Sequence, residues 1–263
     1  MQVITSKDND IVKNIKKLKD KKFRDETSSY IIEGVKIIAE AIEEQAIIKR
    51  IVICEDYIPS GAIDQKLMYE IAKYDCIYVD KKVFDFITTV VTPQGVLAVV
   101  EKPSVHKQID YGEDVILALD GIQDPGNLGT ILRTADSVNL KQIIVSKDTA
   151  DSYNPKVVRS TMGAIFRVNV IESEDLISTL KDIKKNKFKV MATSLGANET
   201  IYDIDYKKKA IVIGNEANGV SKDILEIADS KVIIPMLGKT ESLNASVATG
   251  IILYEYARRK INK

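Results

Sequence analysis

Three separated segments in the second half of the chain carry residue types that can bind a ligand or position a reacting group. They are Asp120–Asp136 (DGIQDPGNLGTILRTAD), Ile211–Ser221 (IVIGNEANGVS) and Ile233–Thr249 (IIPMLGKTESLNASVAT). Each begins in or follows a short β-branched run and combines glycine and asparagine with a few charged or hydroxyl groups. Because α/β proteins bind ligands in loops at the ends of buried strands, three such loops predict one pocket built from backbone groups and a few polar side chains.

The first segment places an amide and a guanidinium on one predicted helix. Asn127 lies near the start of that helix, where it can cap the helix or orient a ligand hydroxyl, and Arg133 lies six residues later. Six residues are about one and two-thirds helical turns, so the two side chains lie on different faces. The guanidinium of Arg133 suits bidentate binding of a phosphate, and pairing with Asp136 or with another helix is the structural alternative.

The other two segments carry a carboxylate and two capping residues. Glu216 lies in a tight turn after a buried strand, where its carboxylate can orient Arg133 or simply face solvent. Ser242 and Asn244 open the last predicted helix, and a role as N-cap is chemically sufficient to explain either of them. Taken one at a time, these residues do not distinguish a functional from a structural role.

Two common nucleotide-binding signatures are absent from the sequence. A dinucleotide fingerprint requires Gly-x-Gly-x-x-Gly between a strand and a helix, and Gly121, Gly126 and Gly129 do not have that spacing. A P-loop requires a further glycine five positions before the glycine of Gly-Lys-Ser/Thr, but Ile233 stands there ahead of Gly238–Thr240. Because the missing glycine forms part of the phosphate cradle, the sequence disfavours nucleotide hydrolysis.

The scarcity of histidine and cysteine bears on metal and nucleophilic chemistry. His106 is the sole histidine and lies in a stretch typical of a linker, while Cys54 and Cys76 lie in apolar runs. We therefore predict no metal site and no Ser/His/Asp triad. No segment reaches the roughly 18 apolar residues of a membrane span, and the basic N-terminus lacks the apolar stretch of a secretory signal. The sequence thus predicts a cytoplasmic protein without a membrane partner.

Charge is balanced overall but not locally. The 263 residues contain 38 basic and 38 acidic side chains, so any surface for a polyanion must be local. Met1–Arg24 holds eight Lys or Arg residues against three Asp residues, a net charge of +5. Such a run is usually a solvated helix face, and it gains meaning only beside other signs of a nucleic-acid partner.

Hydrophobic periodicity predicts an α/β chain of two domains. Residues 1–100 form the first domain, and the polar residues 101–113, with Pro103 and Gly112, form the linker. Because strands alternate with helices in the first domain, a largely parallel sheet is expected there. Its helices are expected at Asp10–Lys19, Val35–Glu44 and Gln65–Lys73, and its strands at Tyr30–Glu33, Arg50–Cys54, Cys76–Val79 and Gly95–Val100.

The second domain, residues 114–263, repeats the alternation of strand and helix. Its continuously apolar strands indicate a sheet covered by helices on both faces. The strands are expected at Val115–Leu119, Gln142–Ser146, Phe166–Val170, Lys189–Thr193, Ala210–Ile213 and Lys231–Ile234. The helices are expected at Leu128–Val138, Pro155–Ser160, Leu176–Asn186, Ser221–Ala228 and Ala245–Lys260.

Taken together, the three segments closely resemble the three motifs of the SpoU (TrmH-type) RNA 2′-O-ribose methyltransferases of the SPOUT superfamily. The matching stretches are DPGNLGTILRTAD around Asn127 and Arg133, IGNEANGVS around Glu216, and IPMLGKTESLNASVATGI around Ser242 and Asn244. The resemblance implies a SPOUT-type α/β domain with a deep C-terminal trefoil knot. It also implies transfer of a methyl group from S-adenosylmethionine to a ribose 2′-hydroxyl of RNA.

The resemblance extends over nearly the whole chain. Tyr153–Val168 is similar to the family. The N-terminal hundred residues, with Ile4–Gly34 as the informative part, resemble its small α/β RNA-binding domain, which is related to kink-turn-binding ribosomal proteins. A separate RNA-binding domain favours ribosomal RNA over transfer RNA as the substrate. The basic N-terminal segment then supplies the candidate RNA contacts Lys16, Lys17, Lys19, Lys22 and Arg24.

The resemblance also implies roles for the residues of the three motifs. Asn127, Ser242 and Asn244 would fix the ribose, and Arg133, oriented by Glu216, would clamp phosphate and hydroxyl. A guanidinium pKa above about 12 argues against Arg133 as the base. The cofactor pocket would be lined by Thr193, Gly214, Asn215, Glu216, Ile234, Met236 and Leu243.

A homodimer and two alternative functions complete the expectations. The family is homodimeric, and the Ala245–Lys260 helix offers Val247, Ile251, Leu253 and Tyr254 to an interface, although burial within the subunit explains much of this surface equally well. A non-catalytic RNA-binding or ribosome-assembly protein could use the same scaffold, but it would be expected to lose the cofactor-loop residues. A methyltransferase for an RNA base is disfavoured only by the resemblance of the TESLNAS segment.

Overall fold

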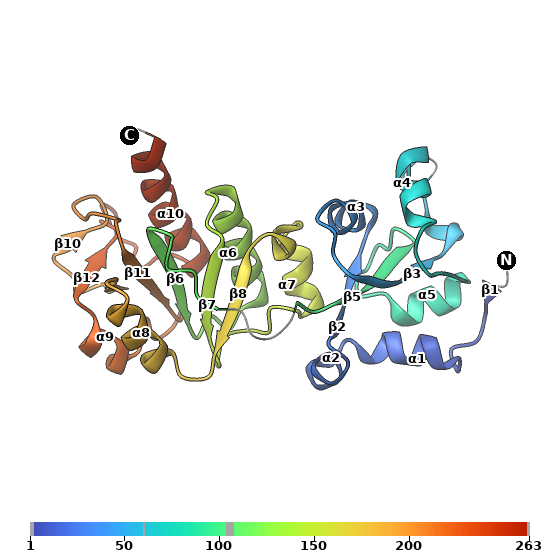
Figure 1. Cartoon of the computed structure of the whole chain (residues 1–263), viewed down its shortest axis with the longest axis horizontal. Helices are drawn as coiled ribbons and strands as arrows, with labels where there is room; N and C mark the ends of the chain where they lie inside the picture. Colours follow the sequence, from blue (N-terminus) through green and yellow to red (C-terminus); the bar gives the residue numbers. More distant parts are fainter. Residues whose placement is uncertain (1–2, 60, 104–107, 262–263) are drawn as a thin grey trace. The chain divides into compact units, whose positions relative to one another are not determined.

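The computed structural model describes residues 3–59, 61–103 and 108–261, which form two compact units (Figure 1). The first unit consists of the chain up to residue 105 together with Tyr153–Phe166. The second consists of residues 106–152 and the chain from Arg167 onward. His106 and its neighbours in the predicted linker lie outside the described residues.

The first unit contains the helices and strands expected from its sequence, together with short elements that were not expected. The unexpected ones are β1 (Val3–Ile4), α2 (Lys21–Thr27), α5 (Lys81–Ile87) and two 3-10 helices, and both α2 and α5 begin at aspartate N-caps, Asp20 and Asp80. The elements are β1 (Val3–Ile4), α1 (Asp10–Lys17), α2 (Lys21–Thr27), β2 (Ser29–Glu33), α3 (Val35–Glu43), β3 (Ile48–Ile53), the 3-10 helix η1 (Glu55–Tyr57), α4 (Gln65–Ile71), β4 (Cys76–Val79), α5 (Lys81–Ile87), β5 (Val96–Glu101), α7 (Pro155–Ser160) and the 3-10 helix η2 (Ala164–Phe166).

The sheet of the first unit is mixed, so the expectation of a largely parallel sheet was wrong. Its strand order is β1-β4-β3-β5-β2. β1, β4 and β3 are parallel, but β5 is antiparallel to both β3 and β2. Val96, at the start of β5, pairs with Ile53 at the end of β3. The alternation of helix and strand does not specify the end of the sheet at which the chain enters the next strand. After α5 the chain enters β5 beside the end of β3, and β5 therefore runs antiparallel to β3.

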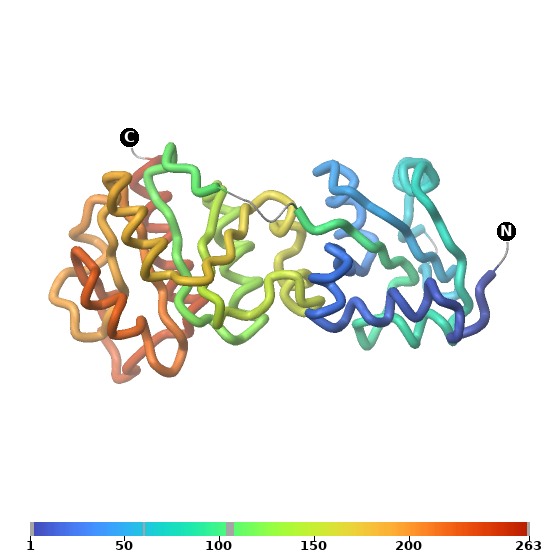
Figure 2. The backbone as a smooth tube through the Cα atoms, turned by 60° about the horizontal axis from the view of Figure 1, so that its bottom comes forward, coloured from blue at the N-terminus to red at the C-terminus, as the bar shows by residue number. Residues whose placement is uncertain are grey.

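A segment between two strands of the second unit folds with the first unit. Val157 and Val158 of α7 are buried, and α7 packs along β2, the edge strand (Figure 2). The Tyr153 ring lies 4.8 Å from the Tyr30 ring. Gly163, at φ 93°, lies so close to Glu40 that a Cβ there would be 2.7 Å from Oε2. The segment therefore covers an edge that would otherwise expose unpaired backbone groups.

The second unit is a parallel α/β sheet, as expected. Its order is β10-β12-β9-β11-β6-β7-β8, and every pairing is parallel. The strands are β6 (Val115–Asp120), β7 (Gln142–Ser146), β8 (Asn169–Ser173), β9 (Lys189–Thr193), β10 (Glu199–Thr200), β11 (Lys209–Gly214) and β12 (Ser230–Ile233). The helices are α6 (Pro125–Ser137), α8 (Leu176–Lys185), α9 (Lys222–Ile227) and α10 (Ala245–Ile261). β8 begins three residues later than expected, because Ala164–Phe166 forms a 3-10 turn instead.

Helices cover both faces of this sheet. On one face, Leu180 of α8 and Ile224 of α9 form a core with alternate strand residues such as Ile116, Ala118 and Val212. α6 and α10 pack closely against each other, and α10 also contacts β11 (Figure 1). The apolar runs predicted this arrangement correctly. Within the described ranges, no helix combines the length and the apolar character needed to cross a bilayer.

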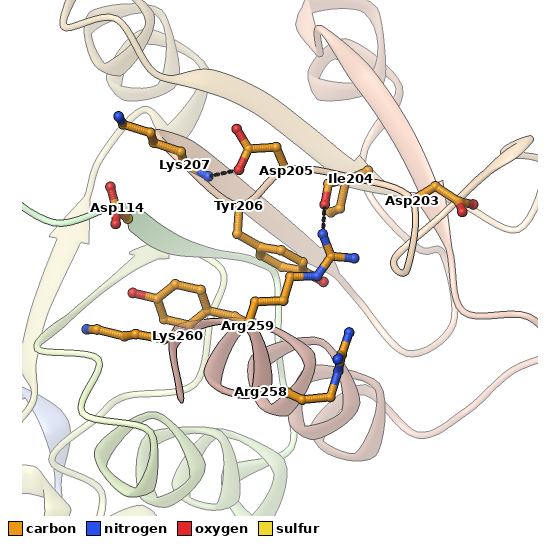
Figure 3. A pocket seen from close by; sticks show the side chains of 10 residues that line it. Asp114, Asp203, Ile204, Asp205, Tyr206, Lys207, Arg258, Arg259 and Lys260 are labelled. Carbon is orange, nitrogen blue, oxygen red and sulfur yellow. Dashed lines mark hydrogen bonds between the residues drawn. The ribbon is translucent and has the colours of Figure 1, made fainter. Parts of the chain in front are cut away.

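The C-terminal part of α10 is anchored by a buried carboxylate. Both Arg258 and Arg259 donate to the Glu255 side chain, at 2.8 and 2.7 Å from their Nε atoms. Arg259 also donates to the carbonyl oxygens of Ile204 and Tyr202. A hollow of about 460 Å³ lies here (Figure 3), but Arg259, which crosses it, is fully engaged by these internal contacts. We therefore interpret the contacts around this hollow as structural. They fix one end of α10, and the other end of this helix reaches the candidate site.

Protonation of Glu255 is expected to weaken the second unit. Hydrogen bonding from Arg258, aided by Arg259, lowers the pKa of Glu255 from 4.5 to about 2. A carboxyl whose pKa is lower in the folded state stabilises the fold above its unfolded pKa, and this contribution is lost as the pH falls from 4.5 towards 2. We expect Glu255→Gln to lower the free energy of unfolding by about 1–3 kcal/mol at pH 7, and the difference to shrink below pH 4.5.

Urea unfolding of both variants across this pH range measures the effect. Glu174→Gln is the matched control, because Glu174 forms an exposed ion pair with Lys147 and should change stability by less than about 0.5 kcal/mol. An equal effect of the two substitutions at neutral pH would contradict the anchoring role of Glu255.

Candidate functional site

The carboxyl ends of four neighbouring parallel strands bring the three sequence motifs together. β6 ends at Asp120 beside Gly214, the last residue of β11, and Thr193 at the end of β9 pairs with Val232 in β12. The first motif follows β6, the second follows β11 and the third follows β12. Because parallel strands end at the same edge of a sheet, residues separated by about a hundred positions meet there, as the sequence predicted.

A chain of side-chain hydrogen bonds connects one residue from each motif. Asn127 Nδ2 donates to Glu216 Oε1 over 2.6 Å, and Asn244 Nδ2 donates to Asn127 Oδ1 over 3.0 Å. Each asparagine sits at a helix start. The Asp124 side chain caps α6 by accepting from the Asn127 backbone N–H, and Asn244 Oδ1 caps α10 by accepting from Ser246. The capping role considered for Asn244 is therefore real, and its amide group contacts Asn127 at the same time.

The turn after β11 is closed too tightly for any residue but glycine at its start. Asn215 and Gly219 exchange two backbone hydrogen bonds of 3.0 and 2.9 Å. A Cβ on Gly214 would lie 2.0 Å from the carbonyl carbon of Gly219. The Asn215 side chain stabilises the turn, because its Oδ1 accepts a hydrogen bond from the Ala217 backbone N–H. Its Nδ2 donates to the carbonyl of Gly121, the residue that follows β6. The turn that presents Glu216 is thus attached to the neighbouring motif.

A cavity of about 500 Å³ lies at this edge of the sheet. Every residue that the resemblance assigned to the cofactor pocket lines it: Thr193, Gly214, Asn215, Glu216, Ile234, Met236 and Leu243. Ser242 lines it as well, whereas Asn127, Arg133 and Asn244 do not. Thr193 Oγ1 donates to the Val212 carbonyl, so this hydroxyl is already used within the sheet.

The cavity combines apolar walls with carboxylates. Its walls include Ile213, Val220, Leu225 and Val232, and the ionisable side chains among its described lining residues are Glu216 and Glu241. No lysine or arginine is among these lining residues. Such a cavity suits an apolar ring system that carries a positive charge, and it disfavours a polyphosphate.

Sequence reasoning missed part of the lining. Ser194–Gly196 follows β9, and Glu241 precedes the predicted ribose-fixing residues. The loop after β9 contains no charged residue, so its only signal was its place after a predicted strand. Glu241 lay inside the third motif, but nothing in the sequence distinguished it from an exposed turn residue.

Arg133 is placed differently from the expectation. Its side chain is exposed on α6 and makes no ion pair with any residue in the described ranges. The alternative pairing with Asp136 was wrong, because Asp136 accepts from Arg167 at 3.0 Å. The idea that Glu216 orients Arg133 is not supported either, because Glu216 bonds to Asn127. Arg133 is left available for a group outside this chain.

The candidate RNA contacts of the first unit fall into two classes. Lys17 and Lys22 are exposed, whereas Lys16 and Lys19 donate to the backbone carbonyls of Phe86 and Thr88. Burial, together with the neighbouring Lys16, lowers the pKa of Lys19 to about 8. These contacts hold the end of α5 against α1, and they leave Lys17 and Lys22 as the lysines of this set that face solvent.

Arg24 is a correction to the predicted RNA contacts. Its side chain is buried, with 1% of its surface exposed, and Nη1 donates to the Leu18 carbonyl over 2.7 Å. The guanidinium therefore fixes the connection between α1 and α2, and it cannot reach a phosphate in this conformation. The basic run alone did not show that this charge lies inside the unit.

Two further observations concern the exposed face of α10 and the grouping of metal-ligating residues. On α10, Leu253 is fully buried within the unit, but Val247 and Tyr254 are 50% and 57% exposed and lie seven residues apart on one face. Within the described part of the chain, no group of three or more His, Cys, Asp or Glu residues is arranged to hold a metal ion.

Two protein families match separate parts of the chain. Residues 114–254 match the SpoU rRNA Methylase family, and residues 9–98 match the MRM3-like substrate binding domain. The 23S rRNA (guanosine(2553)-2′-O)-methyltransferase RlmP of Bacillus subtilis is 32% identical over 255 residues, which cover 97% of this chain and 98% of that protein.

Solved structures of similar chains include two with bound AdoMet. The AdoMet-bound rRNA methyltransferase from Sinorhizobium meliloti is 32% identical, with a TM-score of 0.82 over 99% of this chain and 98% of that one. The SpoU methyltransferase AviRb from Streptomyces viridochromogenes, in complex with AdoMet, is 25% identical, with a TM-score of 0.85 over 96% of this chain and 98% of that one.

A methyl group at Gly214 is expected to force open the turn that presents Glu216. Because a Cβ there would overlap the Gly219 backbone, Gly214→Ala should lower the free energy of unfolding by about 1–3 kcal/mol and accelerate amide hydrogen exchange in residues 215–220. Gly196→Ala is the control, because Gly196 lines the same cavity, has open space around it and does not have a positive φ. Equal protection of the turn in both variants would rule out the steric role of Gly214.

Proposed function

This chain belongs to the SpoU rRNA Methylase family, and from this premise we propose that it transfers the methyl group of S-adenosylmethionine to a ribose 2′-hydroxyl of ribosomal RNA. The observation that carries the proposal is the cavity at the carboxyl ends of β9, β11 and β12, with apolar walls, two carboxylates and no cationic side chain among its described lining residues. This composition fits a nucleoside that bears a positive charge.

S-Adenosylmethionine fits the residues that are present. Ile213, Ile234 and Leu243 offer apolar surface for the adenine ring, and the turn Asn215–Gly219 offers backbone groups for the polar parts of the cofactor. Glu216 and Glu241 supply negative charge beside these walls. The bound cofactor supplies an electrophilic methyl group attached to a positively charged sulfur.

The residues of the chain then position the nucleophile. We assign the ribose to the edge of the cavity at Ser242, where the hydrogen-bonded residues Glu216, Asn127 and Asn244 present amide and carboxylate groups to hydroxyls. Such fixed orientation can contribute about 7–11 kcal/mol to lowering the barrier of a transfer reaction in favourable cases. Arg133, which has no partner among the described residues, is assigned to a phosphate of the RNA.

Substrate binding is assigned to the first unit. RlmP, which aligns over nearly the whole of this chain, is named for 23S rRNA, and this supports ribosomal RNA over transfer RNA. The exposed Lys17 and Lys22 are the proposed contacts, together with the loops that Lys16 and Lys19 hold. We also assign to this unit a likeness to kink-turn-binding ribosomal proteins.

Three further properties belong to the proposal. Two copies pair through α10, and Val247 and Tyr254 supply exposed apolar surface for this contact. The chain after β11 forms a trefoil knot, an idea supported by the order of strands that places β11 between β9 and β6 and β12 beyond β9. A ribosomal RNA substrate is in keeping with a cytoplasmic location.

Transfer of labelled methyl groups tests the proposed function. With labelled S-adenosylmethionine and ribosomal RNA that lacks the modification, the label should appear in a 2′-O-methylnucleoside after digestion. Asn127→Ala should lower turnover by roughly 100-fold, because the link between the three motifs is lost, while cofactor affinity stays within about threefold. Label in a methylated base would contradict the ribose assignment. No transfer and no cofactor binding by the unaltered protein would favour a non-catalytic RNA-binding protein.

Replacement of Arg133 by lysine tests the phosphate assignment. Lysine keeps the charge but loses the planar fork that binds two phosphate oxygens, so Arg133→Lys should lower kcat/KM for RNA by roughly tenfold. The dissociation constant for S-adenosylmethionine, measured by calorimetry, should not change, because Arg133 does not line the cavity. Near-normal turnover of Arg133→Lys would remove the bidentate role.

A further inference from the structure

The two carboxylates of the cavity differ in their contacts. Glu216 accepts a hydrogen bond from Asn127 over 2.6 Å and thereby belongs to the chain of hydrogen bonds that connects the three motifs. Glu241 lies in the segment between β12 and α10, lines the same cavity and has no hydrogen bond or ion pair to any residue that the structure describes. Glu241 is thus a negative charge with no internal partner at the wall of a cofactor site.

The surroundings of Glu241 determine what such a charge can do. No cationic side chain among the described lining residues neutralises it, and apolar walls such as Ile233 and Leu243 reduce the screening by water on one side. The Glu241 side chain remains exposed on the other side, so its interaction with a ligand is moderate and sensitive to salt.

We infer that Glu241 makes the cavity selective for the positively charged cofactor over its neutral demethylated product. The inference rests on the proposed function and deepens it. S-Adenosylmethionine and S-adenosylhomocysteine share the adenosine and the amino-acid group, and they differ in the methyl group and in the charge on sulfur. A carboxylate in the same cavity therefore attracts the first more strongly than the second.

This selectivity has a kinetic consequence. The attraction is present before transfer and absent afterwards, so it favours exchange of product for fresh cofactor. Because it is not strengthened in the transition state, it cannot accelerate the methyl transfer itself. Glu241 is therefore a specificity-determining residue, and its loss should raise KM for the cofactor and strengthen product inhibition without lowering kcat in proportion.

Calorimetric titration with three ligands tests the inference. The probes are S-adenosylmethionine, S-adenosylhomocysteine and sinefungin, which carries a protonated amine in place of the methylated sulfur. Glu241→Gln should weaken the two positively charged ligands by roughly three- to tenfold and leave the neutral one within about twofold, and this change should diminish at high salt. Glu241→Lys should shift the preference further towards the neutral ligand.

Glu226→Gln provides the matched control. Glu226 is an exposed residue of α9 in the same unit that does not line the cavity, and its substitution changes the net charge by the same amount. All three affinities should stay within about twofold of the unaltered protein.

Each possible outcome of these titrations either supports or overturns the inference. An equal loss of affinity for all three ligands in Glu241→Gln would mean that Glu241 binds the groups that they share, and it would overturn the inference while leaving the proposed function intact. Unchanged affinities would overturn it as well. Failure of the unaltered protein to bind any of the three ligands would overturn both the inference and the proposed function.

Discussion

Parallel pairing of β6, β11, β9 and β12 is the constraint on which the candidate site depends. It places the ends of these strands, and the motifs that follow them, at one edge of the sheet. The hydrogen bonds that Asn127 donates to Glu216 and that Asn244 donates to Asn127 lie at exposed positions, where each contributes only about 1 kcal/mol. They are too weak to assemble three loops, so the sheet brings the loops together and the hydrogen bonds then fix their orientation.

The local sequence pattern was sufficient to predict most of the helices and strands. The bounds of β7, β9 and α7 agree with the expected ones, because each is an apolar run or a proline-started helix with clear ends. The direction of β5, the late start of β8 and the place of Tyr153–Phe166 in the first unit depend on how the chain returns to a sheet or packs at a distance. Hydrophobic periodicity contains no information about such connections.

The candidate site was predictable to the extent that it follows the strands. The assigned cofactor residues line one cavity because nearly all of them stand at or just after strand ends. The partners of the charged side chains were not predictable. Glu216 bonds to Asn127 rather than to Arg133, and Arg24 is buried against the Leu18 carbonyl. Both depend on distances between elements that only the assembled fold determines, and both change which charges remain available for a ligand.

The chain couples the two units more closely than a single linker would. It enters the second unit after residue 105, returns to the first at Tyr153 and leaves it again after Phe166. Val157 and Val158 are fully or almost fully buried, and burial of such side chains contributes about 1.5–3 kcal/mol each. Arg167, the first residue after this segment, is bound to Asp136 on α6, the helix that also carries Asn127 and Arg133. Removal of residues 1–100 would therefore expose α7 and η2 as well as delete a domain. The proposed RNA-binding unit thus includes a segment taken from the middle of the methyltransferase sequence, and its two pieces are joined through the second unit in both directions along the chain.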